Sequence, residues 1–346
     1  MNRSSVSNHT HPGSPIPRNY TNVLVICLVL LGLCVVASLV LGSRPVRFHE
    51  LIDGLFHPNA DSYGADVVRK RISRTVFGLC CGAALGVSGA LMQAVTRNPI
   101  ADPSILGVNT GASLFVVCGI AFLNISTANQ YIWLALAGAL ITAVFVFGIG
   151  SMGRGGATPL KLVLAGAATS AALSSLVSAI MIPRSYVMDQ FRFWQVGSVG
   201  SANWSAIATF APFLIVGILI AIITAPALNA LALGDDAATG LGVRTGILRL
   251  AAALAGVLLC GAATALAGPI GFVGLLSTHV VRLMLGPDLR FVIPLSAVSG
   301  AIILMVSDVT GRLIGSPGEL EVGVVTAFIG APILILLAMR AKVRSL

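Results

Sequence analysis

Side chains able to do chemistry are scarce in this chain, and the lysines show what is missing. The P-loop that cradles nucleotide phosphates requires a lysine directly after a glycine. The three lysines, Lys70, Lys161 and Lys342, each follow another residue type. The chain therefore lacks the motif needed to bind ATP itself, and any use of ATP requires a partner protein.

Ionisable residues inside apolar segments are candidates for ion-coupled transport. Here they are His279, Arg282 and Asp308. Asp308 and Arg312 are four residues apart, so on a helix they share one face and can form an ion pair near its end. These residues do not form the series of carboxylates typical of a proton relay. A gradient-driven carrier is therefore the less favoured class of transporter.

Signatures of membrane enzymes are absent from the sequence as well. It contains no His-x-x-x-His, no Gly-x-Ser-x-Gly and no aspartate pair in a catalytic pattern. The six cysteines fall within apolar runs and form no Cys-x-x-Cys pair, which is typical of small buried residues. We therefore predict no catalytic residue.

Long apolar runs separate the few charges and decide the fold class. Hydrophobic residues make up 56% of the chain and charged residues only 10%, whereas soluble domains carry about 25% charged residues. The first run, 23–41, has no charge and approaches the roughly 20 residues that a helix needs to cross a bilayer. Spanning β-strands would be shorter and alternating. The sequence predicts an all-α polytopic membrane protein.

We predict a disordered cytoplasmic tail over 1–21 and a transmembrane permease domain over 22–346. Ten spanning helices are expected near 22–42, 72–96, 104–123, 131–150, 160–183, 204–227, 249–267, 271–286, 291–312 and 323–340. Lys and Arg favour both termini in the cytoplasm by a modest margin, which widens once the loop 43–74, which also carries acidic residues, is set aside. The net charge of +9 comes from residues that flank the spans, so nucleic acid is not an expected partner.

A weak internal similarity pairs the second and seventh spans, since 82–91 resembles 261–270. The seventh span comes five after the second, and because consecutive spans alternate in direction, the two copies would run in opposite directions, as in the inverted repeats of many transporters. The motifs Gly82-x-x-x-Gly86 and Gly107-x-x-x-Gly111 predict close helix packing.

Four sequence blocks carry the strongest signal in the chain: 71–112, 193–198, 231–243 and 268–332, with interruptions in the first and last. These blocks resemble the FecCD-type permeases, the ABC importer family that serves ferric siderophores, haem and cobalamin. In that family proline is usual where Ser73 and Thr278 stand. The stretch 189–194 and the third block are most similar to ferric-enterobactin-type permease subunits.

The resemblance implies a type II ABC importer permease fold in the bacterial inner membrane. It also implies a second permease subunit, identical or different, a cytoplasmic ATPase dimer that binds the ATP, and an extracytoplasmic substrate-binding protein. The favoured cargo is a ferric siderophore, with haem or cobalamin as the alternative. An iron chelate arrives already caged, so we expect no metal site and no cofactor in this chain.

The third block lies within a loop over about 228–248 that the resemblance identifies as the coupling helix region. Short polar helices there would sit in a cleft of the ATPase. An ordinary capped loop is the alternative, because aspartate is favoured at helix N-termini. The residues implied in coupling are Gly234, Asp235, Asp236, Gly240, Leu241 and Gly242.

The resemblance further implies that Arg71, Arg74 and Arg312 receive acidic residues of the binding protein, for which the planar guanidinium is suited. Local pairing, for instance between Arg312 and Asp308, is the alternative. Four cytoplasmic loop residues are weaker candidates for an ATPase-facing loop or an inner gate, and Trp194 and Gln195 either line an outer vestibule or simply pack. The four loop residues are Arg97, Asp102, Arg154 and Lys161.

Overall fold

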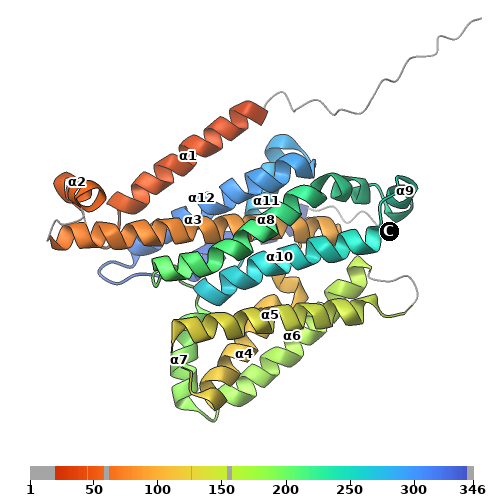
Figure 1. Ribbon diagram of the computed structural model, residues 1–346, viewed down its shortest axis with the longest axis horizontal. Helices are drawn as coiled ribbons and strands as arrows, with labels where there is room; N and C mark the ends of the chain where they lie inside the picture. The colour runs from red at the N-terminus through yellow and green to blue at the C-terminus, as the bar shows by residue number, and fades with distance from the viewer. Residues whose placement is uncertain (1–19, 45, 58–61, 126, 154–157, 341–346) are drawn as a thin grey trace, which may run out of the picture.

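The computed structural model describes residues 20–44, 46–57, 62–125, 127–153 and 158–340, and every regular element in these residues is helical (Figure 1). The predicted tail 1–21 lies almost wholly outside them. The helices are α1 (Tyr20–Val40), α2 (Phe48–Phe56), α3 (Tyr63–Thr96), the 3-10 helix η1 (Pro103–Leu106), α4 (Val108–Leu123), α5 (Ala128–Ser151), α6 (Pro159–Met181), α7 (Ser185–Gln195), α8 (Trp204–Ala232), α9 (Asp235–Gly240), α10 (Thr245–Ala267), α11 (Val273–Leu285), α12 (Leu289–Ile314) and α13 (Val322–Arg340).

Ten of the described helices coincide with the ten predicted spans. Seven are long and apolar enough to cross a membrane, namely α1, α3, α5, α6, α8, α10 and α12. The other three, α4, α11 and α13, are shorter apolar helices. The all-α polytopic fold predicted from the apolar runs is therefore confirmed. The predicted second span starts too late, because α3 begins at Tyr63.

Helix α3 lies at the centre of the bundle, between α12, α11 and α10 (Figure 1). Glycines make this position possible. A Cβ on Gly82 would lie 2.6 Å from the Cα of Ala301 on α12, and one on Gly274 of α11 would lie 2.7 Å from the carbonyl oxygen of Leu85. Gly86 and Gly89 face the backbones of α12 and α11 in the same way. The close packing predicted for the first glycine motif is confirmed.

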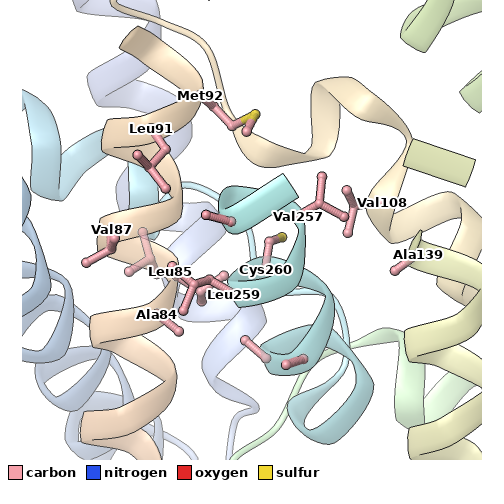
Figure 2. Packing of buried hydrophobic residues seen from close by; sticks show 14 of the residues in the cluster. Ala84, Leu85, Val87, Leu91, Met92, Val108, Ala139, Val257, Leu259 and Cys260 are labelled. Carbon is pink, nitrogen blue, oxygen red and sulfur yellow. The ribbon is translucent and has the colours of Figure 1, made fainter. Parts of the chain in front are cut away.

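Helix α10 runs antiparallel to α3 (Figure 1) and separates it from α4 and α5 (Figure 2). The hydroxyl of Ser88 on α3 donates a 2.6 Å hydrogen bond to the carbonyl of Gly256 on α10. Figure 2 shows Leu91 and Met92 of α3 on one side of α10 and Val108 and Ala139 on the other. This antiparallel arrangement is the one expected for inverted copies, although the repeat itself stays a prediction.

Local sequence signals define the ends of α3. The side chain of Ser62 accepts a hydrogen bond from the amide of Ala65, and Asp66 occupies the first turn, where both stabilise a helix start. At the other end Arg97 adopts the left-handed conformation with φ 50° and ends the helix. Pro99 follows two residues later, where a helix cannot continue.

The two positions where the family usually has proline lie within helices. The Ser73 hydroxyl donates to the carbonyl of Lys70 at 3.0 Å, and the Thr278 hydroxyl donates to that of Gly274 at 2.8 Å. Both side chains are buried, so these bonds within the helix satisfy hydroxyl groups that would otherwise be costly to bury.

The glycine contacts of α3 yield a prediction with a matched control. Gly82→Ala should lower the free energy of unfolding by about 1–3 kcal/mol, because its methyl group meets the α12 backbone. Gly32→Ala on α1, where a Cβ would meet nothing within 4 Å, should be neutral or stabilising by up to about 1 kcal/mol. Thermal unfolding in detergent measures both. Equal effects of the two variants would show that α3 and α12 are not in backbone contact.

Candidate functional site

A group of charges, buried or half-buried except for the exposed Glu319, joins the first half of α3 to the end of α12 and the segment after it. We name it the Arg74 cluster: Arg71, Arg74, Asp308, Arg312 and Glu319. The guanidinium of Arg74 donates to Asp308 Oδ1 from Nε at 3.0 Å and from Nη2 at 2.7 Å. It also donates to Glu319 Oε2 at 2.6 Å. Asp308 is 1% exposed, and a carboxylate so buried requires charged partners of this kind.

The other two arginines of the Arg74 cluster cap the end of α1. Arg71 donates to the carbonyls of Leu39 and Val40 at 2.9 Å and to that of Arg44 at 2.7 Å. The last carbonyls of a helix lack donors within the helix, and cations are favourable beside them.

Arg312 completes the cap from α12. Its Nη1 donates to the carbonyls of Ser38 and Leu41, both at 3.0 Å. It also forms a 3.0 Å ion pair with Asp308. Most side chains of α1 are not buried against the bundle, so these arginine contacts tie the helix to α3 and α12.

The structure therefore contains the ion pair between Arg312 and Asp308 that the sequence offered as the alternative to docking. Arg312 is 2% exposed and Arg71 is 7% exposed, so neither guanidinium can reach a binding-protein carboxylate without leaving these partners. Arg74 differs because one of its partners, Glu319, lies on the surface. The docking role of all three arginines stays a prediction, and the geometry favours it only for Arg74.

A cavity of about 890 Å³ opens beside the Arg74 cluster. Its walls come from α3, α7, α10, α12 and the segment 198–206, and they include more basic than acidic side chains. Trp194, predicted to line a vestibule or to pack, lines this cavity and also stacks on Phe191 at 5.6 Å between ring centroids. Gln195 is exposed and does not contribute to the lining.

The opposite end of α3 carries a second group of charges, which we name the Asp235 cluster: Arg97, Asp235 and Arg249. Oδ1 of Asp235, the first residue of α9, accepts hydrogen bonds from Arg97 and from Arg249, the latter at 2.8 Å. Arg97 ends α3, and Arg249 lies in the second turn of α10. A single carboxylate therefore joins α9 to the end of α3 and to α10.

The two arginines favour the charged form of the Asp235 carboxyl. Burial would raise the pKa of this carboxyl, but the hydrogen bond and charge of Arg249, with the charge of Arg97, lower its pKa below the ordinary value. A lowered pKa means that the contribution of Asp235 to stability is fully present near neutral pH and is lost only as the pH falls through that lowered pKa.

The other residues predicted for coupling lie on the exposed side of α9 and in the turn after it. Asp236, Gly240 and Gly242 are exposed, and Leu241 is 67% exposed. Gly242, at φ 82°, makes the turn toward α10, and Gly234, at φ 118°, makes the turn into α9, both conformations that favour glycine. The two adjacent aspartates therefore point in different directions. Asp235 contacts the arginines of α3 and α10, whereas Asp236 is exposed.

The remaining candidates do not form one site. Asp102 caps η1 by accepting from the Ser104 amide at 3.0 Å, and burial raises its pKa despite that bond. Lys161 donates to the carbonyl of Met152 at 3.3 Å. Arg154 lies outside the described residues. Arg97 joins another predicted residue, Asp235.

Sequence reasoning missed Arg249 and Glu319 as members of these clusters. Arg249 sits at the start of an apolar run, where a basic residue is ordinarily a topology signal. Glu319 lies in a block that carries the family resemblance, without an assigned role. Among the described residues there is also no group of three His, Cys, Asp or Glu side chains able to hold a metal ion.

Known proteins resemble the chain over most of its length. A family model described as the FecCD transport family matches residues 29–340. The ferric enterobactin transport system permease protein FepD of Escherichia coli is 42% identical over 314 residues, covering 90% of this chain and 93% of that protein. The Fe(3+)-citrate import system permease protein YfmD of Bacillus subtilis is 40% identical over 319 residues, covering 92% and 93%.

A solved structure also resembles the fold. It is described as an inward-facing conformation of a protein assigned to the metal-chelate type of ABC transporter. It matches with a TM-score of 0.79 and 27% sequence identity, and the match covers 93% of this chain and 99% of that one. The arrangement of helices in this chain is therefore shared with that solved structure.

The capping role of Arg312 can be tested against an exposed arginine. Arg312→Met leaves Asp308 with one fewer partner and frees α1 carbonyls, so the free energy of unfolding should fall by about 3 kcal/mol or more. Arg192→Met on α7 removes an ion pair with Asp189 in which both side chains are about 60% exposed, and it should change stability by less than about 1 kcal/mol. Chemical unfolding in detergent compares the two. A fall for Arg312→Met no larger than for Arg192→Met would contradict the capping role.

Proposed function

The chain belongs to the FecCD transport family, and we propose that it is the membrane-spanning permease subunit of a binding-protein-dependent ABC importer. Its proposed cargo is a ferric siderophore, carried across the bacterial inner membrane. The observation that carries this proposal is the similarity, over about nine-tenths of the chain, to permeases named for ferric enterobactin and Fe(3+)-citrate.

The energy for transport comes, in this proposal, from a cytoplasmic ATPase dimer. The chain has no P-loop lysine of its own, so in this proposal the ATPase subunits bind the nucleotide. The permease itself is proposed to carry no cofactor and no enzymatic activity. The proposed ATPase contact is the exposed side of α9, which includes Asp236, together with Leu241 directly after it. It suits that role because it is short, polar and exposed at one end of the bundle (Figure 1).

The α9 end of the bundle is the proposed cytoplasmic side, with both termini on that side. The first residue of α1, Tyr20, stacks on Phe291 near the start of α12 at 4.8 Å. The Asp288 side chain, just before α12, accepts a 2.6 Å hydrogen bond from Asn229 near the end of α8. These contacts place the start of α1 at the end of the bundle where α8 leads into α9.

The Arg74 cluster and its cavity then face outward, toward the binding protein. Among the three arginines predicted for docking, we assign the contact to Arg74, which would exchange Glu319 for a carboxylate of the binding protein. Charge pairs at such rims guide encounter and register. Arg71 and Arg312 support the site by holding α1.

The cargo needs no metal ligands from the permease, because a siderophore already surrounds its iron. A cavity of about 890 Å³ beside basic side chains suits a bulky anionic chelate. Haem and cobalamin are the alternative cargoes, and the second permease subunit is either a copy of this chain or a related one.

Uptake measurements test the cargo directly. Cells that lack this gene should lose uptake of a radiolabelled ferric catecholate siderophore and recover it when the gene is restored, while haem and cobalamin uptake stay unchanged. If haem or cobalamin uptake were lost instead, the chain would still be an importer permease, but its cargo would be haem or cobalamin. Unchanged uptake of all three would overturn the proposal.

A further inference from the structure

The Asp235 cluster is built differently from an ordinary surface ion pair. Both arginines converge on one oxygen, Oδ1 of Asp235. The Arg249 side chain is only 6% exposed, although that of Asp235 is 46% exposed. Exposed pairs contribute little to stability because water screens them, whereas a buried guanidinium that loses its carboxylate is left with an uncompensated charge.

Each residue of the Asp235 cluster belongs to a different part of the fold, and these positions determine what the cluster can do. Arg97 ends α3, Arg249 belongs to the second turn of α10, and Asp235 begins α9. No side chain of α9 other than Ala238 is buried. The carboxylate of Asp235 is therefore the main polar attachment of α9 to the two central helices.

We infer that Asp235 is a positioning residue that makes α9 move with α3 and α10, and that it is not itself an ATPase contact. This inference rests on the proposed function, because α9 has a force to transmit only if an ATPase docks on it. It assigns different tasks to the two adjacent aspartates. Asp235 holds α9 from inside, while Asp236, on the exposed side, meets the partner.

Both helices that Asp235 holds lead into the centre of the bundle. Helix α3 runs without a break from Arg74 in its first half to Thr96, and Arg97 follows it directly, so this one helix connects the two charge clusters. Helix α10 contacts α3 through the Ser88–Gly256 hydrogen bond, and its last residues, 265–267, line the outer cavity. A displacement of α9 therefore acts on α3 and α10, two of the helices that line the cavity.

The test compares Asp235→Asn with Asp235→Glu in the complete transporter reconstituted in liposomes with its ATPase and binding protein. Asparagine keeps the shape of the side chain and removes its charge, so it weakens both bonds to arginine. Asp189→Asn on α7 is the matched control, because it makes the same chemical change in an ion pair that is exposed on both sides. The readouts are ATPase retained on the complex, ATP hydrolysed per cargo delivered, and hydrogen exchange of the α9 amides.

Asp235→Asn should retain the ATPase on the complex yet hydrolyse about tenfold more ATP per cargo delivered, and its α9 amides should exchange about tenfold faster. Asp235→Glu should restore most of the coupling, and Asp189→Asn should resemble the unaltered protein. Arg97→Gly, which suits the left-handed φ at that position, should reproduce the Asp235→Asn defect.

Three outcomes would overturn the inference. One is unaltered ATP use per cargo in Asp235→Asn. Another is loss of ATPase from the Asp235→Asn complex with unaltered α9 exchange, which would make Asp235 a direct contact. The third is a defect in Asp189→Asn of the same size. Failure of the proposed function is recognised separately, because the unaltered chain would then neither retain the ATPase nor deliver a ferric chelate.

Discussion

Helix α3 can occupy the centre of the bundle only because glycines on several of its turns allow α11 and α12 to approach its backbone. Lipid provides no hydrophobic force between helices, so their association depends on close packing and on polar contacts between them. At Gly82 and at Gly274 of α11 there is no room for a side chain. The position of α3 in turn fixes where its two ends lie, and both charge clusters depend on that.

The two clusters use the same chemistry for different purposes. In the Arg74 cluster, arginines hold the C-terminal carbonyls of α1 and compensate the buried Asp308. In the Asp235 cluster, arginines of α3 and α10 hold a short helix that has almost no buried side chain of its own. The planar guanidinium suits both tasks, because it donates several hydrogen bonds in fixed directions. In the transporter that we propose, one cluster faces the binding protein and the other faces the ATPase.

Sequence patterns predict the spans well because a bilayer requires long apolar helices, and all ten predicted spans coincide with described helices. The short helix α9 also follows from its aspartates and flanking glycines. The direction in which each aspartate points does not follow from its type. Neighbouring residues on a helix lie about 100° apart, and only the positions of Arg97 and Arg249 show that Asp235 faces α3 and α10. Likewise, Arg71 and Arg312 donate to backbone carbonyls at the end of α1. Every residue has a backbone carbonyl, so no sequence motif identifies these partners.

The central claim is that α9 and the end of α3 move as one body, and a distance across the Asp235 cluster tests it most directly. Spin labels on Thr239 of α9 and on Ile100, which follows α3, would occupy exposed positions in a variant whose six native cysteines are replaced by alanine. Pulsed electron resonance on the reconstituted transporter should give the same narrow distance distribution with and without ATP. A distribution that shifts or broadens when ATP binds would show that α9 moves independently of α3, and would contradict the account.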